Sequence, residues 1–128
     1  SITRRYDMDC LRRAYDAYCK RHPDNEILFM GGVYVEVDTD DTALEDRLLS
    51  ENHDPLLLAT SMRSTVGPAM RVPLYAHGVR EPLHTASSPR GRCLQEDFIR
   101  GLRLMAEKDV PFDACVRPNE LSNLAQAC

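Results

Sequence analysis

The sequence lacks long apolar runs and any concentration of positive charge. No apolar run approaches the roughly 20 residues that cross a bilayer, and the opening SITRRYDMD has no apolar core of a secretory signal. A formal net charge of -4 provides no global field that would attract nucleic acid or an anionic membrane. We therefore expect no membrane insertion and no nucleic-acid partner. Because residue 1 is serine, a lost initiator methionine, a leader or a longer N-terminal segment all remain open alternatives.

Paired cysteine motifs are also absent. Five cysteines, at positions 10, 19, 93, 115 and 128, make an odd number with no C-x-x-C pair. This pattern argues against a disulfide framework and against a thiolate zinc site. We interpret each cysteine as a small buried hydrophobe or a surface thiol, and we expect an intracellular, reducing compartment, either the cytoplasm or an organellar matrix.

The length and the hydrophobic content of the chain fit one domain over residues 1–128. The length of 128 residues and a hydrophobic content of 43% are enough for a conventional core. No repeat, low-complexity tract or composition shift marks an internal boundary.

Hydrophobic periodicity predicts helices that alternate with strands. Helices are expected at 8–19, with Asp7 as the N-cap, within 38–53, at 95–110 and at 119–128. Strands are expected at 27–38, 54–61, 77–84 and 111–118, whereas residues 62–76 keep no period and contain Gly67, Pro68 and Pro73, as a loop does. Alternation of this kind predicts βαβ units and a parallel sheet with helices packed on it.

Polar side chains occupy one face of each clearly alternating strand. Tyr34, Glu36 and Asp38 alternate with valines, while other strands carry Arg80 with His84, and Asp113 with Arg117. Strands buried on both faces should be nearly all apolar, whereas a barrel turns one face inward. We therefore predict an α/β fold that is a partial (β/α)8 TIM barrel, with about four βα units and parallel strands. Its aliphatic edges would meet helices, and Glu36, Asp38, Arg80, His84 and Arg117 would converge at one mouth.

The stretches VYVEVD, HGVREPLH and EDFIRGLRLMAEKDVPFDACVRPNELSNLA resemble the central part of the amidohydrolase-superfamily lactonases. That group contains sugar-lactone hydrolases and 2-pyrone-4,6-dicarboxylate lactonase. The resemblance is strongest over 78–127, weaker over 6–50 and poor over 55–76, which is shorter than the helix usual there. It implies that Glu36 closes the second barrel strand, that Arg80 and His84 close the fourth, and that Arg117 follows the fifth.

The resemblance gives these residues roles in holding and opening an acidic lactone. Arg80 would bind the substrate carboxylate with its planar fork, the alternative being a structural ion pair in the lumen. Glu36 would bind substrate or form a salt bridge with Arg80 or Arg117. Arg117 would bind substrate or be structural. His84 would be catalytic, polarising the carbonyl, or would be a packing residue.

The departures from the family are as specific as the match. The histidines, at 22, 53, 77 and 84, never stand two apart, so the H-x-H metal pair is absent, and the chain ends where the sixth strand should begin. No metal ligands or cofactor are evident, and a divalent metal would require additional sequence. A typical barrel has about 250 residues, so half a barrel would leave two unpaired strand edges and an open apolar flank. Another protein chain or the remainder of the barrel is therefore an expected partner.

Two functions follow as hypotheses. The chain is a segment of a lactonase-like hydrolase that cleaves a cyclic ester of a sugar acid or a carboxylated lactone. Alternatively, it is a catalytically inactive, barrel-derived structural or interaction subunit of a larger assembly.

Overall fold

The computed structural model describes residues 7–37, 39 and 41–128. Within them, three parallel strands form a sheet in the order β1-β2-β3, namely β1 (Gly32–Val35), β2 (Leu57–Arg63) and β3 (Gly78–Arg80). The helices are α1 (Met8–Arg21), α2 (Thr42–Ser50), α3 (Glu96–Glu107) and α4 (Leu121–Ala127), with short 3-10 turns at Arg92–Leu94 and Pro118–Glu120. The predicted α/β class with parallel strands is confirmed.

Two of the helices begin at side-chain caps. The Asp7 carboxylate accepts a hydrogen bond from the Cys10 N–H at 3.0 Å, which confirms the predicted N-cap of α1. Asp41 accepts in the same way from the Leu44 N–H at 2.9 Å and starts α2. Each cap satisfies one of the N–H groups that the first helical turn leaves without a partner.

The predicted strand at 111–118 is only partly formed. It contributes two isolated parallel bridges, Val79 with Phe112 and Pro82 with Cys115, in place of a continuous strand. Proline has no N–H to donate, and Pro82 and Pro111 both fall in this ladder, so the hydrogen bonds are carried by neighbours such as Leu83 N–H to Cys115 O at 3.1 Å. The segment nevertheless continues the sheet beyond β3.

The two faces of β1 are not separated as cleanly as predicted. The Tyr34 hydroxyl donates to Glu45 Oε1 of α2 at 2.7 Å, so Tyr34 points toward the helix. Alternate residues of a strand point to opposite sides, and Val33 is accordingly 59% exposed. The expectation that the valine edge meets the helices is therefore met only in part, because Val33 lines an apolar pocket with Leu11 of α1 and Leu48 of α2 but stays largely exposed. Burial and the Glu45 carboxylate together raise the Tyr34 pKa, which keeps the hydroxyl protonated as a donor.

The core lies between β3 and α3. Val79 of β3 and Phe98 of α3 are fully buried, and Phe98 meets Phe112 edge to face, with ring centroids 5.6 Å apart. Met105 lies about two helical turns further along the same side of α3 and is also buried. The helix predicted at 95–110 is thus confirmed as α3, and its apolar side covers the core.

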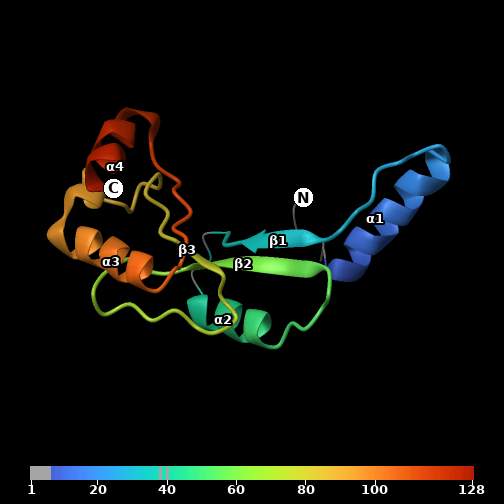
Figure 1. Ribbon diagram of the computed structural model, residues 1–128, viewed down its shortest axis with the longest axis horizontal. Helices are drawn as coiled ribbons and strands as arrows, with labels where there is room; N and C mark the ends of the chain where they lie inside the picture. Colours follow the sequence, from blue (N-terminus) through green and yellow to red (C-terminus); the bar gives the residue numbers. More distant parts are fainter. Residues whose placement is uncertain (1–6, 38, 40) are drawn as a thin grey trace.

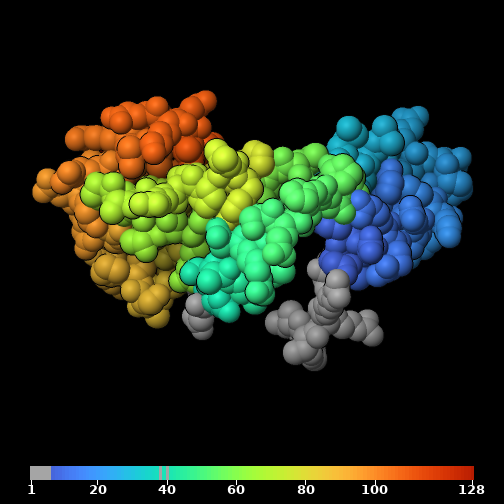
Figure 2. All heavy atoms as spheres, turned by 90° about the horizontal axis from the view of Figure 1, so that it is seen from below, coloured from blue at the N-terminus to red at the C-terminus, as the bar shows by residue number. Residues whose placement is uncertain are grey.

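The chain is elongated, with α1 at one end and α3 and α4 at the other (Figure 1). Figure 2 shows α2 on the underside, between α1 and the C-terminal elements. The segment before β1 exposes large apolar side chains, including Leu28 at 77% and Met30 at 72%. In the described part of the chain, no helix has the length and apolar character needed to cross a membrane.

Candidate functional site

Four charged residues stand at the carboxyl ends of neighbouring parallel segments. Glu36 directly follows β1, Arg63 and Arg80 are the last residues of β2 and β3, and Asp113 follows the bridge residue Phe112. We call Glu36, Arg63, Arg80 and Asp113 the strand-end cluster. In folds built from parallel βα units, this end of the strands is where ligands bind.

Arg80 is the centre of the strand-end cluster. Its Nε and Nη2 groups both donate to Asp113 Oδ2, at 2.9 and 2.6 Å. Its Nη1 atom lies 3.8 Å from Glu36 Oε1, an ion pair too long for a hydrogen bond. The Glu36 side chain is only 2% exposed, whereas that of Arg80 is 22% exposed. The guanidinium therefore joins two carboxylates from different strands and still reaches solvent.

Arg63 extends the cluster toward a cavity. It is the ladder partner of Arg80 across β2 and β3, so both side chains start from the same face of the sheet. Its Nη1 group donates to the Thr39 carbonyl at 2.8 Å. With two arginines and two carboxylates, the formal charges of the cluster balance.

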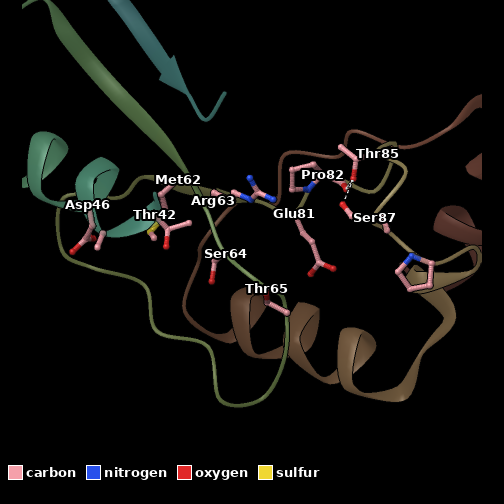
Figure 3. Close-up of a pocket in the computed structure, with 13 residues that line it drawn as sticks. Thr42, Asp46, Met62, Arg63, Ser64, Thr65, Glu81, Pro82, Thr85 and Ser87 are labelled. Atoms are coloured by element: carbon pink, nitrogen blue, oxygen red, sulfur yellow. Dashed lines mark hydrogen bonds between the residues drawn. The ribbon is translucent and has the colours of Figure 1, made fainter. Parts of the chain in front are cut away.

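A polar cavity of about 560 Å³ opens beside the carboxyl ends of β2 and β3, and we call it the α2–β3 cavity. Its walls come from the first turns of α2, from residues 62–65 at the end of β2, and from the loop after β3, where Thr85, Ser87 and Ser88 line it. Figure 3 shows the Arg63 guanidinium beside Pro82, while Ser64 and Glu81 point to the other side of the strand. Hydroxyl groups from three separate segments thus face a shared space.

One wall of the α2–β3 cavity contains Glu81, which forms an ion pair with Arg92. Arg92, 6% exposed, donates from Nε to Glu81 Oε1 at 2.7 Å and from Nη2 to the Val66 carbonyl at 2.8 Å. The Val66 N–H donates in turn to Glu81 Oε2 at 2.6 Å. Glu81 therefore has its acceptors committed to the protein and serves to fix the wall.

The predicted site residues do not all meet. Glu36 and Arg80 lie together, as described above. Arg117 instead donates to Glu120 Oε2 at 2.6 Å and to carbonyl groups of the loop after β3. His84 is exposed in a turn past β3, and among the residues the structure describes no hydrogen bond or ion pair joins it to the cluster. Asp38 lies outside the described residues.

Two members of the strand-end cluster were not predicted as ligand-binding residues. Asp113 stands on the polar face of its segment, but no binding role was assigned to it. Arg63 was missed because the second strand was expected to end at Ser61, two residues too early. An arginine that ends an apolar strand, as Arg80 also does, is the signal that could have found it.

The described residues do not fit a metal site. Over residues 7–37, 39 and 41–128, no group of three or more His, Cys, Asp or Glu side chains is placed to hold an ion. The chemistry offered by the strand-end cluster is therefore charge pairing and hydrogen bonding.

Comparison with known proteins finds amidohydrolases. No protein-family model and no curated protein matches the chain. Amidohydrolase 2 from Bifidobacterium longum subsp. infantis is 48% identical, with a TM-score of 0.83, over 98% of this chain and 46% of that one. An amidohydrolase from Burkholderia multivorans, solved with bound HEPES, is 19% identical, with a TM-score of 0.67, over 99% of this chain and 44% of that one.

The chain spans less than half the length of the solved structures it matches. Nearly all of this chain superimposes on one part of each of these structures. The structural neighbours of this chain are thus amidohydrolases, and its fold is that of a partial TIM-barrel-like fragment of such a hydrolase.

Proposed function

We propose that the chain is the substrate-holding part of a lactonase of the amidohydrolase type. The substrate would be a cyclic ester of a sugar acid or a carboxylated lactone. The observation that carries this proposal is the position of Arg80, held between Glu36 and Asp113 at the carboxyl ends of parallel strands. Asp113 occupies one side of the guanidinium and fixes its orientation.

The geometry of Arg80 supports recognition of a carboxylate. A guanidinium carries five N–H donors in a rigid fork, and Asp113 takes those of Nε and one of Nη2 through a single oxygen. The end of the fork formed by Nη1 and Nη2 keeps further donors for an incoming oxyanion. These donors would pair with the carboxylate that the substrate already carries, and so would hold the lactone ring in one orientation.

Glu36 and His84 have different places in this proposal. Glu36, buried beside Arg80, would orient the guanidinium or accept a hydrogen bond from a substrate hydroxyl. His84, exposed past β3, would polarise the lactone carbonyl only when a bound substrate reaches it. Hydrolysis also needs an activated water. We therefore propose that the remainder of the barrel, or another chain, supplies the water-activating groups and any divalent metal.

The cysteines bear on the compartment in which such an enzyme would work. All five cysteines lie within the described residues, and all five are free thiols. Free thiols persist in reducing compartments, where disulfides are rare. We propose an intracellular site of action on this ground.

Lactone hydrolysis by the purified protein, with the partner or remainder of the barrel present, tests the proposal. Arg80→Ala should lower kcat/KM for a carboxylated lactone by roughly 100-fold, as expected when a buried charged contact loses one partner. The matched control is Arg100→Ala, because Arg100 is exposed on α3 away from the cluster. Equal activities of the two variants would remove Arg80 from the site. Absence of lactone hydrolysis in the assembled wild type would favour the inactive structural subunit.

A further inference from the structure

We propose that Arg117 and Glu120 form a clamp that holds loop 85–91 in place and so shapes one wall of the α2–β3 cavity. We call this pair the loop clamp. Loop 85–91 connects β3 to the 3-10 turn before α3, whereas the loop clamp comes from the next βα unit. One unit would thus position the cavity wall of the unit before it. The effect on catalysis rests on the proposed function, but the effect on the loop does not.

Arg117 forms hydrogen bonds with backbone carbonyl groups in the first part of the loop. Its Nη2 group donates to the Thr85 carbonyl and, at 2.9 Å, to the Ser88 carbonyl. Its Nη1 group donates to Glu120 Oε2 at 2.6 Å. The guanidinium is thereby engaged with its own chain, so Arg117 acts as a positioning residue that works through the loop, in place of the predicted substrate contact.

Glu120 forms a hydrogen bond with the backbone at the other end of the loop. Its Oε1 atom accepts a hydrogen bond from the Gly91 N–H at 2.5 Å, and the residue is only 7% exposed. Gly91 has a φ of 69°, a left-handed conformation that glycine adopts without a steric penalty. This backbone turn presents the N–H to the carboxylate, so the loop clamp requires glycine at this position.

The loop held in this way carries the polar wall of the cavity. Thr85, Ser87 and Ser88 line the α2–β3 cavity, and the Ser87 and Thr85 hydroxyls lie 3.0 Å apart. The Ser88 hydroxyl is buried, and among the described residues it has no hydrogen-bond partner. A buried hydroxyl without a partner is costly unless a ligand or a water meets it. Movement of the loop would therefore change the polar groups offered to a substrate.

The ionised form of Glu120 is the form that holds the loop. The Gly91 N–H, the Arg117 guanidinium and the nearby charge of Arg90 lower the Glu120 pKa below its ordinary value of 4.5, against the effect of burial. The Glu120 charge also acts on Cys93, whose pKa is raised by burial and by the charges of Glu120 and Cys128. Because the folded pKa is depressed, the contribution of Glu120 is present above about 4.5 and is lost as the pH falls through the folded value.

Limited proteolysis with trypsin tests the loop clamp directly, since the exposed Arg90 lies inside the loop. Arg117→Lys keeps the charge but cannot make three directed hydrogen bonds with a planar fork. We expect cleavage after Arg90 to become about tenfold faster in Arg117→Lys, the factor expected when a hydrogen bond to a charged group is lost. Glu120→Gln should act in the same direction.

Controls separate the loop clamp from general instability and from the proposed function. Glu107→Gln, exposed on α3, should leave the cleavage rate unchanged, and so should Arg80→Ala. In lactone hydrolysis, Arg117→Lys should raise KM with little change in kcat, whereas partial unfolding would lower kcat at constant KM. Faster cleavage without any lactonase activity supports the clamp and counts only against the proposed function. Unchanged cleavage in folded Arg117→Lys and Glu120→Gln overturns the clamp.

Discussion

The Arg80 guanidinium lies 2.6 Å from Asp113 Oδ2, and this pair joins the last residue of β3 to the segment that continues the sheet. Both Nε and Nη2 share the same oxygen, so the plane of the guanidinium is set by Asp113. The side chain of Asp113 is 37% exposed, which makes the pair accessible to solvent. The pair therefore orients the Arg80 guanidinium more than it stabilises the fold.

Asp113→Asn should separate these two contributions. An ion pair this exposed contributes at most about 1 kcal/mol to the free energy of unfolding, so urea unfolding should shift little. The activity on carboxylated lactones should fall roughly tenfold, because Arg80 loses the partner that fixes its fork. A large loss of stability in the urea experiment would show that the pair is mainly structural.

Gly101 on α3 should not tolerate a side chain. A Cβ at this position would lie 2.4 Å from the Gly67 nitrogen, which is backbone and cannot rotate away. We expect Gly101→Ala to lower the free energy of unfolding by about 1–3 kcal/mol, as overpacking does. Gly67→Ala is the matched control, since a Cβ there meets nothing within 4 Å. Equal stability of the two variants in thermal melts would contradict the close approach of α3 to this loop.

Arg92 should be essential to the wall of the α2–β3 cavity. Arg92→Met would leave Glu81 Oε1 and the Val66 carbonyl without the guanidinium that donates to them. Breaking a buried pair in this way costs about 3–5 kcal/mol in the free energy of unfolding, measured by denaturant titration. An Arg103→Met variant, altered at an exposed position of the following helix, should be nearly neutral. If Arg92→Met left the free energy of unfolding unchanged, the Arg92–Glu81 ion pair would contribute nothing to stability.

The attachment of α1 should depend on acid pH. Arg12 Nη2 donates to Asp54 Oδ1 at 2.6 Å, and with the Leu56 N–H it holds the pKa of Asp54 below the ordinary value of 3.8. Because the folded pKa is depressed, the stabilisation is present above about 3.8 and is lost as the pH falls through the folded value. An NMR titration of the Asp54 carboxyl should show this lower midpoint. A midpoint at the ordinary value would mean that the contact to α1 does not persist in solution.

The fold was predictable from the sequence where local patterns and packing agree. The stripe on α3 and the Asp7 cap of α1 are local signals, and both are confirmed. The contact of Tyr34 with a helix was not predicted, because polarity alone cannot tell a lumen from a helix that offers a hydrogen-bond partner. Glu45 of α2 supplies that partner for Tyr34, and a contact across 11 residues has no local signature.

The candidate site was predictable only in part for a similar reason. Glu36 and Arg80 lie together because the strand register brings the ends of β1 and β3 to the same edge of the sheet. Alternation in the sequence placed Arg117 on the polar face of a strand, but the chain turns into a 3-10 segment directly after it, and Glu120 then lies within reach. The partners of Arg117 depend on the paths of loop 85–91 and of the turn after Arg117. The periodicity of apolar residues in the sequence does not predict those paths.

The central claim is that Arg80 recognises the carboxylate of a lactone. The most direct measurement compares kcat/KM for a carboxylated lactone and a neutral lactone of the same ring size, in wild type and in Arg80→Ala, with the remainder of the barrel present. We predict that the substitution lowers kcat/KM for the carboxylated lactone by roughly 100-fold and for the neutral lactone by less than about tenfold. An equal loss on both substrates would contradict carboxylate recognition by Arg80.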